Sequence, residues 1–505
     1  MLSRIYSVAA CGIEPVLVDC EVDSRNGLPS ITIVGLPDTV VKESKERVIS
    51  AIKNSGYQVP INKSLTINLA PAEVRKVGAY YDLPIAIAVL VSTGQLSINI
   101  AEKFMMIGEL GLDGRVKAVQ GVLLVSILAK EKDIKYVFVP KENAEEASLV
   151  EDVQVVAIST LTEVIDILAS GEIVVYQRGL KKKESIKHAL DFSEVKGQGF
   201  AKRAGEIAAS GGHNFFLIGP PGCGKSMIAK RFPSILPDLS EEEALDVIKI
   251  HSVSGKTKRG SIFKSRPFRS PHHTISYAGL IGGTSSSKPG EVSLAHKGVL
   301  FLDEILEFDR KSLESLRQPM EDGEVTVARA SNSYKYPASF ILVASANPCP
   351  CGYSTHPTVS CTCNSHQKLQ YFRKMSGPLI DRFDLVVEMS PVSEDDLLST
   401  QQAEPSCDIQ KRVESARNIQ RQRFAGKGIT LNAEMSDRDI GIYCKVAENT
   451  TDFIRRALKR YSLSGRALNR LLKVARTIAD LESNENIKLE HVLEAFHFRR
   501  SIENV

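Results

Sequence analysis

A glycine-rich segment that ends in lysine and serine carries the clearest chemistry in the chain. GPPGCGKS, from Gly219 to Ser226, fits the pattern G-x-x-x-x-G-K-[ST] at every fixed position. In such a loop, glycines let backbone N–H groups close around phosphates, the lysine neutralises charge on the β- and γ-phosphates, and the serine hydroxyl ligates Mg²⁺. We therefore expect an ATP and Mg²⁺ site. Its ATP-binding residues would be Gly219, Pro220, Pro221, Gly222, Cys223, Gly224, Lys225 and Ser226, together with Asp303 further along the chain.

Two acids end an apolar run further along the chain. The segment VLFLDE, 299–304, predicts a strand that delivers Asp303 to hold Mg²⁺ together with Ser226, and Glu304 to activate a water as general base. The alternative is that the two acids simply lie in solvent at the end of a strand and have no catalytic role. The pairing of these acids with the phosphate loop favours the catalytic interpretation.

The elements around these groups predict a parallel sheet. FFLIG before the loop, VLFLDE, and FILVASAN at 340–347 are almost wholly apolar, which is typical of parallel strands covered on both faces. MIAKRF after the loop has a helical pattern. This arrangement indicates an α/β fold.

The rest of the 505-residue chain divides by composition. Residues 1–175 alternate β-rich runs such as ITIVGL and LTINLAP with helical patterns, including one that Asp82 could cap. We expect a polar, basic linker at 176–190, the nucleotide-binding core at 191–390, and helices at 391–505.

Bulk composition excludes some classes of protein. The formal net charge is +4, too mild to indicate nucleic-acid binding by itself. The nine cysteines form no evident disulfide framework, and neither a secretory leader nor an apolar run of membrane-spanning length is evident. We expect a cytoplasmic protein without a membrane partner.

Several motifs together resemble the magnesium-chelatase-like AAA+ family, specifically its YifB/ComM branch. They are GPPGCGKS, SLAHKGVLFLDE, LRQPMEDGEVTVARA, SANPCPCG and SGPLIDRFDL, and they span most of the chain. The N-terminal PAEVRKVGAYYDLPIAIAVL resembles a Lon-protease-like domain. The resemblance implies an AAA+ P-loop ATPase core, an N-terminal Lon-protease-like α/β domain and a C-terminal helical lid.

The same resemblance implies roles for three further residues. Asn347 resembles the sensor-1 position, where an amide orients the lytic water, although such an asparagine is otherwise a common turn former. Arg382 resembles an arginine finger that enters a neighbour's site, and the alternative is an ion pair with Asp381 or Asp384.

Arg466 resembles the sensor-2 arginine of a helical lid. Arg470 and Lys473 share its helix, and we expect those two to lie on a solvated surface.

Two segments are candidates for DNA contact. KSRPFRSPHHTISYAGLIGG contains Arg266 and Arg269 among aromatic residues, and in related ring ATPases this position carries a pore loop. The alternative is a surface loop without a binding role, in which the glycines only permit turns. GEVTVARASNSYKYPASF has a hairpin pattern in which Arg329 and Lys335 flank the tip, and it resembles a pre-sensor-1 hairpin.

Four of the cysteines have metal-ligand spacing. Cys349, Cys351, Cys361 and Cys363 form two C-x-C pairs, which supply four soft ligands for tetrahedral Zn²⁺. The alternative is a set of buried, reduced thiols.

The Lon-like segment lacks the groups that proteolysis needs. KVGAYYDLPIA has no serine at the nucleophile position, and Lys117 is displaced from the place of the lysine base. We expect a non-catalytic scaffold or partner-binding module.

Three functions are compatible with these features. The first, in the terms of the resemblance, is a homohexameric ATP-dependent helicase that promotes branch migration on single-stranded, forked or branched DNA during natural transformation and homologous recombination. The second is a magnesium-chelatase ATPase subunit that inserts Mg²⁺ into a porphyrin. The third is a nucleotide-binding scaffold without hydrolysis.

Overall fold

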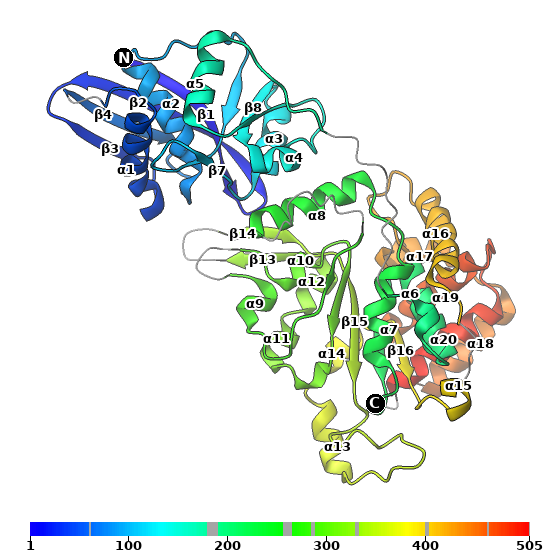
Figure 1. Ribbon diagram of the computed structural model, residues 1–505. Coiled ribbons are helices and arrows are strands. Elements are labelled where there is room, and N and C mark those ends of the chain that lie inside the picture. Colours follow the sequence, from blue (N-terminus) through cyan, green and yellow to red (C-terminus); the bar gives the residue numbers. More distant parts are fainter. Residues whose placement is uncertain are drawn as a thin grey trace. The chain divides into compact units, whose positions relative to one another are not determined.

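The chain forms two compact units in the computed structural model (Figure 1). One unit comprises Met1–Glu184 with Ala244–Ile262, and the other comprises Ser185–Glu243 with Phe263–Val505. The structure describes residues 1–59, 62–178, 190–255, 265–283, 288–328, 333–398, 403–461 and 464–503. None of the helices in these ranges is long and apolar enough to span a bilayer.

The first unit is built on a seven-stranded mixed sheet. The strand order is β3 (Ser30–Val34), β4 (Lys63–Ala70), β2 (Glu14–Asn26), β1 (Leu2–Cys11), β5 (Phe104–Met106), β8 (Tyr136–Pro140) and β9 (Gln154–Ile158). Strand β2 runs antiparallel to both of its neighbours, and the other pairs are parallel. The strands expected at ITIVGL and LTINLAP are confirmed as β3 and β4. The principal helices are α1 (Thr39–Asn54), α2 (Asp82–Ser92), α3 (Val122–Glu131), α4 (Ala144–Ala147) and α5 (Leu161–Ser170).

Asp82 does not cap helix α2, contrary to expectation. The cap position is Tyr81, and Asp82 is the first helical residue. Its buried carboxylate instead accepts a hydrogen bond of 2.6 Å from Arg47 of α1 and one of 3.2 Å from the backbone N–H of Leu110. A buried carboxylate needs such partners, so the acid ties α2 to its neighbours.

The second unit contains a five-stranded parallel sheet. Its order is β11 (Phe268–Arg269), β12 (Val299–Leu302), β15 (Ile341–Ala346), β10 (Phe215–Ile218) and β16 (Leu385–Glu388). All neighbouring strands are parallel, which confirms the prediction drawn from their apolar sequences. Ile218 pairs with Ala346, and Leu302 pairs with Ala344. The residues that follow these three strands therefore meet at one edge of the sheet.

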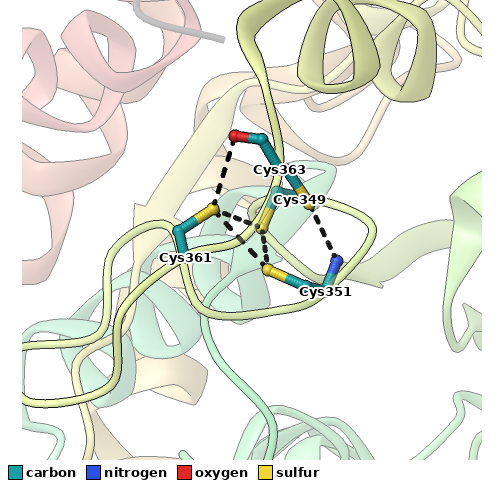
Figure 2. A group of neighbouring side chains, drawn as sticks. All are labelled: Cys349, Cys351, Cys361 and Cys363. Carbon is teal, nitrogen blue, oxygen red and sulfur yellow. Dashed lines mark hydrogen bonds between the residues drawn. The ribbon is translucent and has the colours of Figure 1, made fainter.

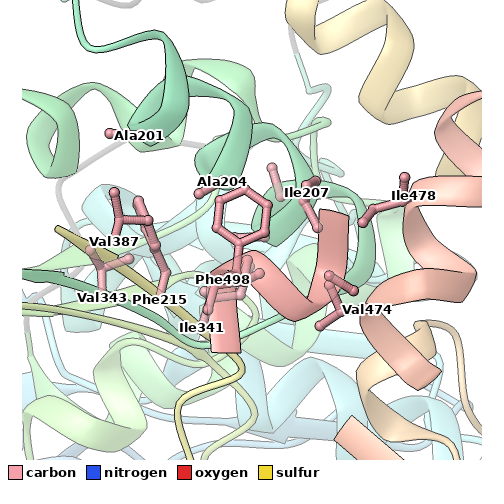
Figure 3. Packing of buried hydrophobic residues seen from close by; sticks show 14 of the residues in the cluster. Ala201, Ala204, Ile207, Phe215, Ile341, Val343, Val387, Val474, Ile478 and Phe498 are labelled. Carbon is pink, nitrogen blue, oxygen red and sulfur yellow. The ribbon is translucent and has the colours of Figure 1, made fainter. Parts of the chain in front are cut away.

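Helices from both ends of this unit share its core. Figure 3 shows Ile207 of α6 (Gly199–Gly211), Val474 of α19 (Gly465–Leu481) and Phe498 of α20 (Leu489–Glu503) packed with Phe215 and Val343 of the sheet. The C-terminal helices expected as a lid thus belong to the same compact unit as the sheet. The other helices after residue 403 are α16 (Ser406–Arg423), α17 (Asp437–Tyr443) and α18 (Glu448–Tyr461).

Shorter elements complete the unit. Before residue 330 they are α7 (Lys225–Arg231), the start of α8 (Glu241–Ser254), α9 (Tyr277–Ile281), α10 (Glu291–Leu294), α11 (Arg310–Glu314) and α12 (Arg317–Asp322). After the sheet strand β15 they are α13 (Ser365–Phe372), α14 (Gly377–Ile380) and α15 (Glu394–Leu398). The predicted hairpin is confirmed as β13 (Glu324–Ala328) paired antiparallel with β14 (Ser333–Pro337).

Candidate active site

The glycine-rich loop joins strand β10, which lies between β15 and β16, to helix α7. Gly222 and Gly224 have φ of +79° and +96°, in the left-handed region that favours glycine. A Cβ at Gly219 would lie 2.6 Å from the carbonyl oxygen of Met389 and 2.8 Å from Sγ of Cys223. The sequence Gly-x-x-Gly-x-Gly is therefore required by backbone conformation and close packing.

Lys225 is buried at the end of this loop. Its Nζ donates hydrogen bonds of 2.6 Å to the Gly219 carbonyl, 2.9 Å to the Pro220 carbonyl and 3.1 Å to Oδ1 of Asn347. Burial holds the pKa of Lys225 below its usual value, although Cys223, Asp303 and Glu304 oppose that shift. The ammonium group is thus fixed among oxygen acceptors, and phosphate oxygens present the same chemistry.

Asp303 lies beside Ser226 at the same edge of the sheet. The Ser226 hydroxyl donates a 2.8 Å hydrogen bond to Oδ2 of Asp303, and the Ser345 hydroxyl donates to Oδ1. A hydroxyl and a carboxylate at this separation are oxygen ligands of the kind that Mg²⁺ prefers, so the pair fits the ion.

Glu304 is exposed and has φ of +51°, unusual for a residue with a side chain. Its backbone N–H donates a 3.1 Å hydrogen bond to the Ser345 hydroxyl, which helps to hold this conformation. Such backbone strain concentrates at functional sites. The sequence signal for Ser345 is its polar side chain within the otherwise apolar strand ILVASA.

Arg382 lies at the opposite edge of the sheet. It precedes strand β16, and its carbonyl accepts a 3.0 Å hydrogen bond from Nδ2 of Asn214, the residue before β10. Because β10 and β16 are parallel and in register, Arg382 is at the amino edge and the phosphate loop is at the carboxyl edge. One chain cannot present both groups to one phosphate.

The Arg382 guanidinium is paired, but not with the acids that its sequence neighbours suggested. It forms an ion pair with Glu321 of α12, and burial lowers its pKa. Within the described ranges its buried Nε has no hydrogen-bond partner. Asp381 and Asp384 instead contact Arg499 and Arg470.

Arg466 shares a cleft with Arg382. The cleft has a volume of about 610 Å³ and contains residues of α12, α19 and the segment before β16. Arg466 is exposed on the first turn of α19, also at the amino edge. The expected solvated positions of Arg470 and Lys473 are wrong: Arg470 pairs with buried Asp384 at 2.8 Å, and Lys473 donates to the Ala433 carbonyl at 2.9 Å.

Comparisons with known proteins place this site in a family. Family models of the magnesium chelatase subunit ChlI match residues 20–143 and 191–397, and a model of its C-terminal part matches 403–499. Competence protein ComM of Haemophilus influenzae is 40% identical, over 99% of this chain and 98% of its own. The uncharacterised protein YifB of Escherichia coli is 41% identical, over 99% and 97%.

The chain belongs to the magnesium-chelatase-like family. Membership implies an AAA+ type ATPase that uses a nucleotide and Mg²⁺. The magnesium-chelatase 67 kDa subunit of Chlorobaculum parvum is a more distant relative, 28% identical over 163 residues, which is 32% of this chain and 23% of that protein.

Two of the expected DNA contacts in this family member are engaged within the protein. Arg266 is buried and donates to Glu243 and to the carbonyls of Pro237 and Lys297. Arg269 lies in strand β11 and pairs with both carboxylate oxygens of Glu291. These contacts within the protein disfavour Arg266 and Arg269 as DNA contacts, and Arg269 lies in a strand that joins the sheet.

The hairpin of this magnesium-chelatase-like chain keeps one candidate cation at the surface. Lys335 of β14 is 69% exposed and forms a 2.7 Å ion pair with Glu324 of β13. Arg329 lies outside the described residues.

The four clustered cysteines come together in the loop between β15 and α13. Figure 2 shows the side chains of Cys349, Cys351, Cys361 and Cys363 converging, and none is in a disulfide. A hydrogen bond from the Tyr353 backbone N–H lowers the pKa of Cys351 to about 5, whereas burial raises the pKa of Cys363 to about 11. The sequence prediction that they form one group is supported by their positions.

Lys117, the lysine compared with the base of Lon-type proteases, lies in the first unit. Lys117 is 60% exposed on β7 (Val116–Lys117) and pairs with Glu109 of β6 (Glu109–Leu110) at 3.5 Å. An exposed, ion-paired ammonium is poorly suited to act as a buried general base.

Proposed function

We propose that this chain is an AAA+ ATPase whose copies form a homohexameric ring and drive DNA strand exchange with the energy of ATP hydrolysis. Lys225 and the backbone of Gly219–Gly224 hold the phosphates. Ser226 and Asp303 hold Mg²⁺, which when bound neutralises charge on the β- and γ-phosphates. Glu304 takes the proton from the attacking water, and Asn347 orients that water.

The position of Arg382 carries the assembly part of this proposal. Stabilising charge on the γ-phosphate requires a guanidinium beside it in the transition state. Lys225 comes after the carboxyl end of β10, whereas Arg382 comes before the amino end of the adjacent parallel strand β16. Arg382 therefore reaches a nucleotide only in a neighbouring copy. Its ion pair with Glu321 and the hydrogen bond that its Nη1 donates to the Pro378 carbonyl keep the guanidinium in a fixed orientation.

Arg466 belongs to the same contact. It lines the cleft that contains Arg382. Four other cations of that cleft are engaged within the protein, namely Arg266, Arg417, Arg470 and Lys473. We assign Arg466 as a second cation that acts on the neighbour's nucleotide. This assignment relocates the sensor-2 role from the chain's own site to the adjoining one.

DNA is the substrate that the relatives and the hairpin favour. The full-length relative from Haemophilus influenzae is named a competence protein, which suggests a role in natural transformation and recombination. Lys335 offers an exposed cation on a two-stranded projection, suited to a phosphate backbone. Branch migration on forked or branched DNA is the activity that would account for both the competence-protein relative and the exposed lysine.

The remaining parts of the chain have supporting roles in this proposal. Residues 1–175 are a Lon-protease-like domain that binds a partner without catalysis. Residues 176–190 are the linker, of which 179–189 lie outside the described residues. Residues 191–390 are the ATPase core, and 391–505 are the helical lid.

The decisive experiment measures ATP hydrolysis with and without forked DNA, and strand displacement, for wild-type protein and Glu304→Gln. DNA should stimulate hydrolysis by the wild type, and only the wild type should displace a strand. ATP hydrolysis that no DNA structure accelerates, together with no displacement, would contradict the DNA proposal.

A magnesium-chelatase subunit is the second candidate, because all three matching family models describe that enzyme. The relatives that match nearly the whole chain favour the DNA motor, since the chelatase subunit aligns with only 32% of it. ATP-dependent Mg²⁺ insertion into a porphyrin, supported by chelatase partner subunits, would establish this alternative. A scaffold without hydrolysis is disfavoured because the groups for phosphate, metal and water are assembled at one edge.

A further inference from the structure

Four thiols of the loop after β15 converge on one point. The Sγ atoms of Cys349 and Cys351 are 3.3 Å apart, those of Cys349 and Cys361 are 3.7 Å apart, and those of Cys351 and Cys361 are 3.6 Å apart. All four ligand atoms lie within 4.8 Å of one another. Figure 2 shows the four side chains pointing toward one another.

These separations match a single tetrahedral ion. A zinc–sulfur bond of about 2.3 Å gives a regular tetrahedron with sulfur–sulfur edges of about 3.8 Å. A disulfide requires about 2.05 Å, which none of these pairs approaches. An iron–sulfur cluster places several irons and bridging sulfides between its cysteines, and the space between these thiols is too small for that.

The cluster differs from the chain's isolated cysteines. Cys20 and Cys444 are buried singly among apolar side chains, as reduced structural thiols usually are. In the cluster, Cys351, Cys361 and Cys363 are only half-buried, yet their sulfurs face one another. The Cys351 backbone N–H also points at Sγ of Cys363, 3.4 Å away, as outer hydrogen bonds do around metal thiolates.

The loop that carries the cysteines is not held in place by secondary structure. Residues 347–364 contain no helix or strand, so no hydrogen-bond ladder fixes their path. His356 is not among the converging ligands, and its Nδ1 accepts a 3.0 Å hydrogen bond from the Val359 backbone N–H. The donor set is therefore four cysteine sulfurs with no open position, which is the composition of a structural zinc site.

The same loop touches the phosphate loop. Gly352, next to Cys351, has φ of +87°, and a Cβ added there would lie 2.8 Å from Cδ of Pro221. Asn347, two residues before Cys349, accepts the 3.1 Å hydrogen bond from Lys225. The cysteine loop thus forms one wall of the nucleotide site.

We infer that Cys349, Cys351, Cys361 and Cys363 bind one Zn²⁺ ion, and that this ion holds the loop 347–364 in contact with Pro221. The zinc site stands independently of the DNA proposal, whereas its positioning role rests on the proposed nucleotide site.

Metal content of full-length protein tests the site. Wild-type protein, purified without a metal-binding tag from zinc-supplemented cells, should contain about one zinc per chain by elemental analysis. Cys361→Ser and the double variant Cys351→Ser/Cys361→Ser should lose zinc by about tenfold or more. The matched control is Cys407→Ser, because Cys407 is exposed and outside the cluster, and it should keep its zinc.

A second measurement covers the case in which the serine variants do not fold. Wild-type protein stripped of zinc should take up Co²⁺ and show the absorption bands of tetrahedral cobalt thiolate. A metal-free wild type that also fails to bind Co²⁺, or a folded double variant that retains full zinc, would overturn the site.

The positioning role is tested by Gly352→Ala, which adds a Cβ against Pro221 and leaves all four thiols in place. We expect unchanged zinc content and about tenfold weaker binding of a fluorescent ATP analogue. Zinc removal from the wild type should weaken the same binding, and zinc addition should restore it. Equal nucleotide affinity in all these samples would overturn the positioning role. None of these measurements uses DNA, so their failure is distinct from failure of the DNA proposal.

Discussion

Arg382 is ion-paired with Glu321 inside the protein, at the edge of the sheet opposite the phosphate loop. Because the guanidinium cannot reach its own chain's nucleotide, replacing it should affect hydrolysis without affecting binding. We expect Arg382→Ala to lower the ATPase rate by about 10³-fold or more, with ATP affinity unchanged. Arg455→Ala is the control, since Arg455 forms only an exposed pair with Asp452.

Mixing two inactive variants sharpens that prediction. Lys225→Ala lacks the phosphate-binding lysine and keeps Arg382, whereas Arg382→Ala has the converse defect. A mixture should regain part of the wild-type rate, because some interfaces then contain both groups. No recovery in mixtures that do co-assemble would place Arg382 outside the neighbouring site.

Glu304 should separate ATP binding from ATP hydrolysis. In the proposed mechanism Asp303 and Ser226 supply the Mg²⁺ ligands, so Glu304→Gln should bind MgATP normally while hydrolysis falls by about 10²–10⁴-fold. Single-turnover hydrolysis and equilibrium binding check the two parts. The control is Glu307→Gln, an exposed acid three residues later that pairs with Lys374. A similar rate loss in both variants would argue against a general base at Glu304.

Lys335 should affect DNA-dependent activity more than basal activity. Lys335→Ala is expected to lower DNA-stimulated ATP hydrolysis while leaving the DNA-free rate nearly unchanged. The salt dependence of DNA binding should also become shallower, by about one in the slope of log affinity against log salt, because one phosphate contact is lost. Lys411→Ala, which removes a similarly exposed and ion-paired lysine, should change neither quantity. Equal losses with and without DNA would contradict a role in DNA contact.

Asp384 should make the second unit sensitive to acid. Burial alone would raise its pKa, but Arg470, His213 and Arg499 outweigh burial and hold the pKa well below the usual range. A carboxyl whose folded pKa is lowered stabilises the fold at pH values above its unfolded pKa of about 3.9 and loses that contribution as the pH falls further.

Asp384→Asn should therefore destabilise the protein at neutral pH by about 3–5 kcal/mol and flatten the loss of stability below about pH 4. Thermal unfolding from pH 7 to pH 3 measures both effects. Asp452→Asn removes an exposed acid and should change stability by less than about 0.5 kcal/mol. An unchanged pH profile in Asp384→Asn would contradict the assignment.

The sequence predicted the local parts of the site well, because strand, loop and helix there follow one another along the chain. The apolar runs before Gly219 and Asp303 were sufficient to infer parallel strands. Their order in the sheet, with β15 between β10 and β12, brings Asn347 to Lys225, and that proximity could be expected only through the family resemblance.

Long-range charge pairing was less predictable. Arg266 and Arg269 have the composition of a DNA-binding loop, yet each meets an acid more than 20 residues away along the chain. The partners Glu243 and Glu291 lie in elements whose placement depends on the tertiary fold. For the same reason, neighbouring acids suggested the wrong partner for Arg382.

Under the proposed assembly, the positions of Lys225 and Arg382 at opposite edges of one sheet also set how activity depends on protein concentration. Copies that join carboxyl edge to amino edge use two different surfaces, so the contact is heterologous and closes into a cycle or continues as an open chain. In a closed cycle each nucleotide has a donor arginine, whereas an open chain leaves one terminal nucleotide without one. The ATPase rate per subunit should therefore increase with protein concentration. It should be near zero for separated copies and reach a plateau when the cycle closes.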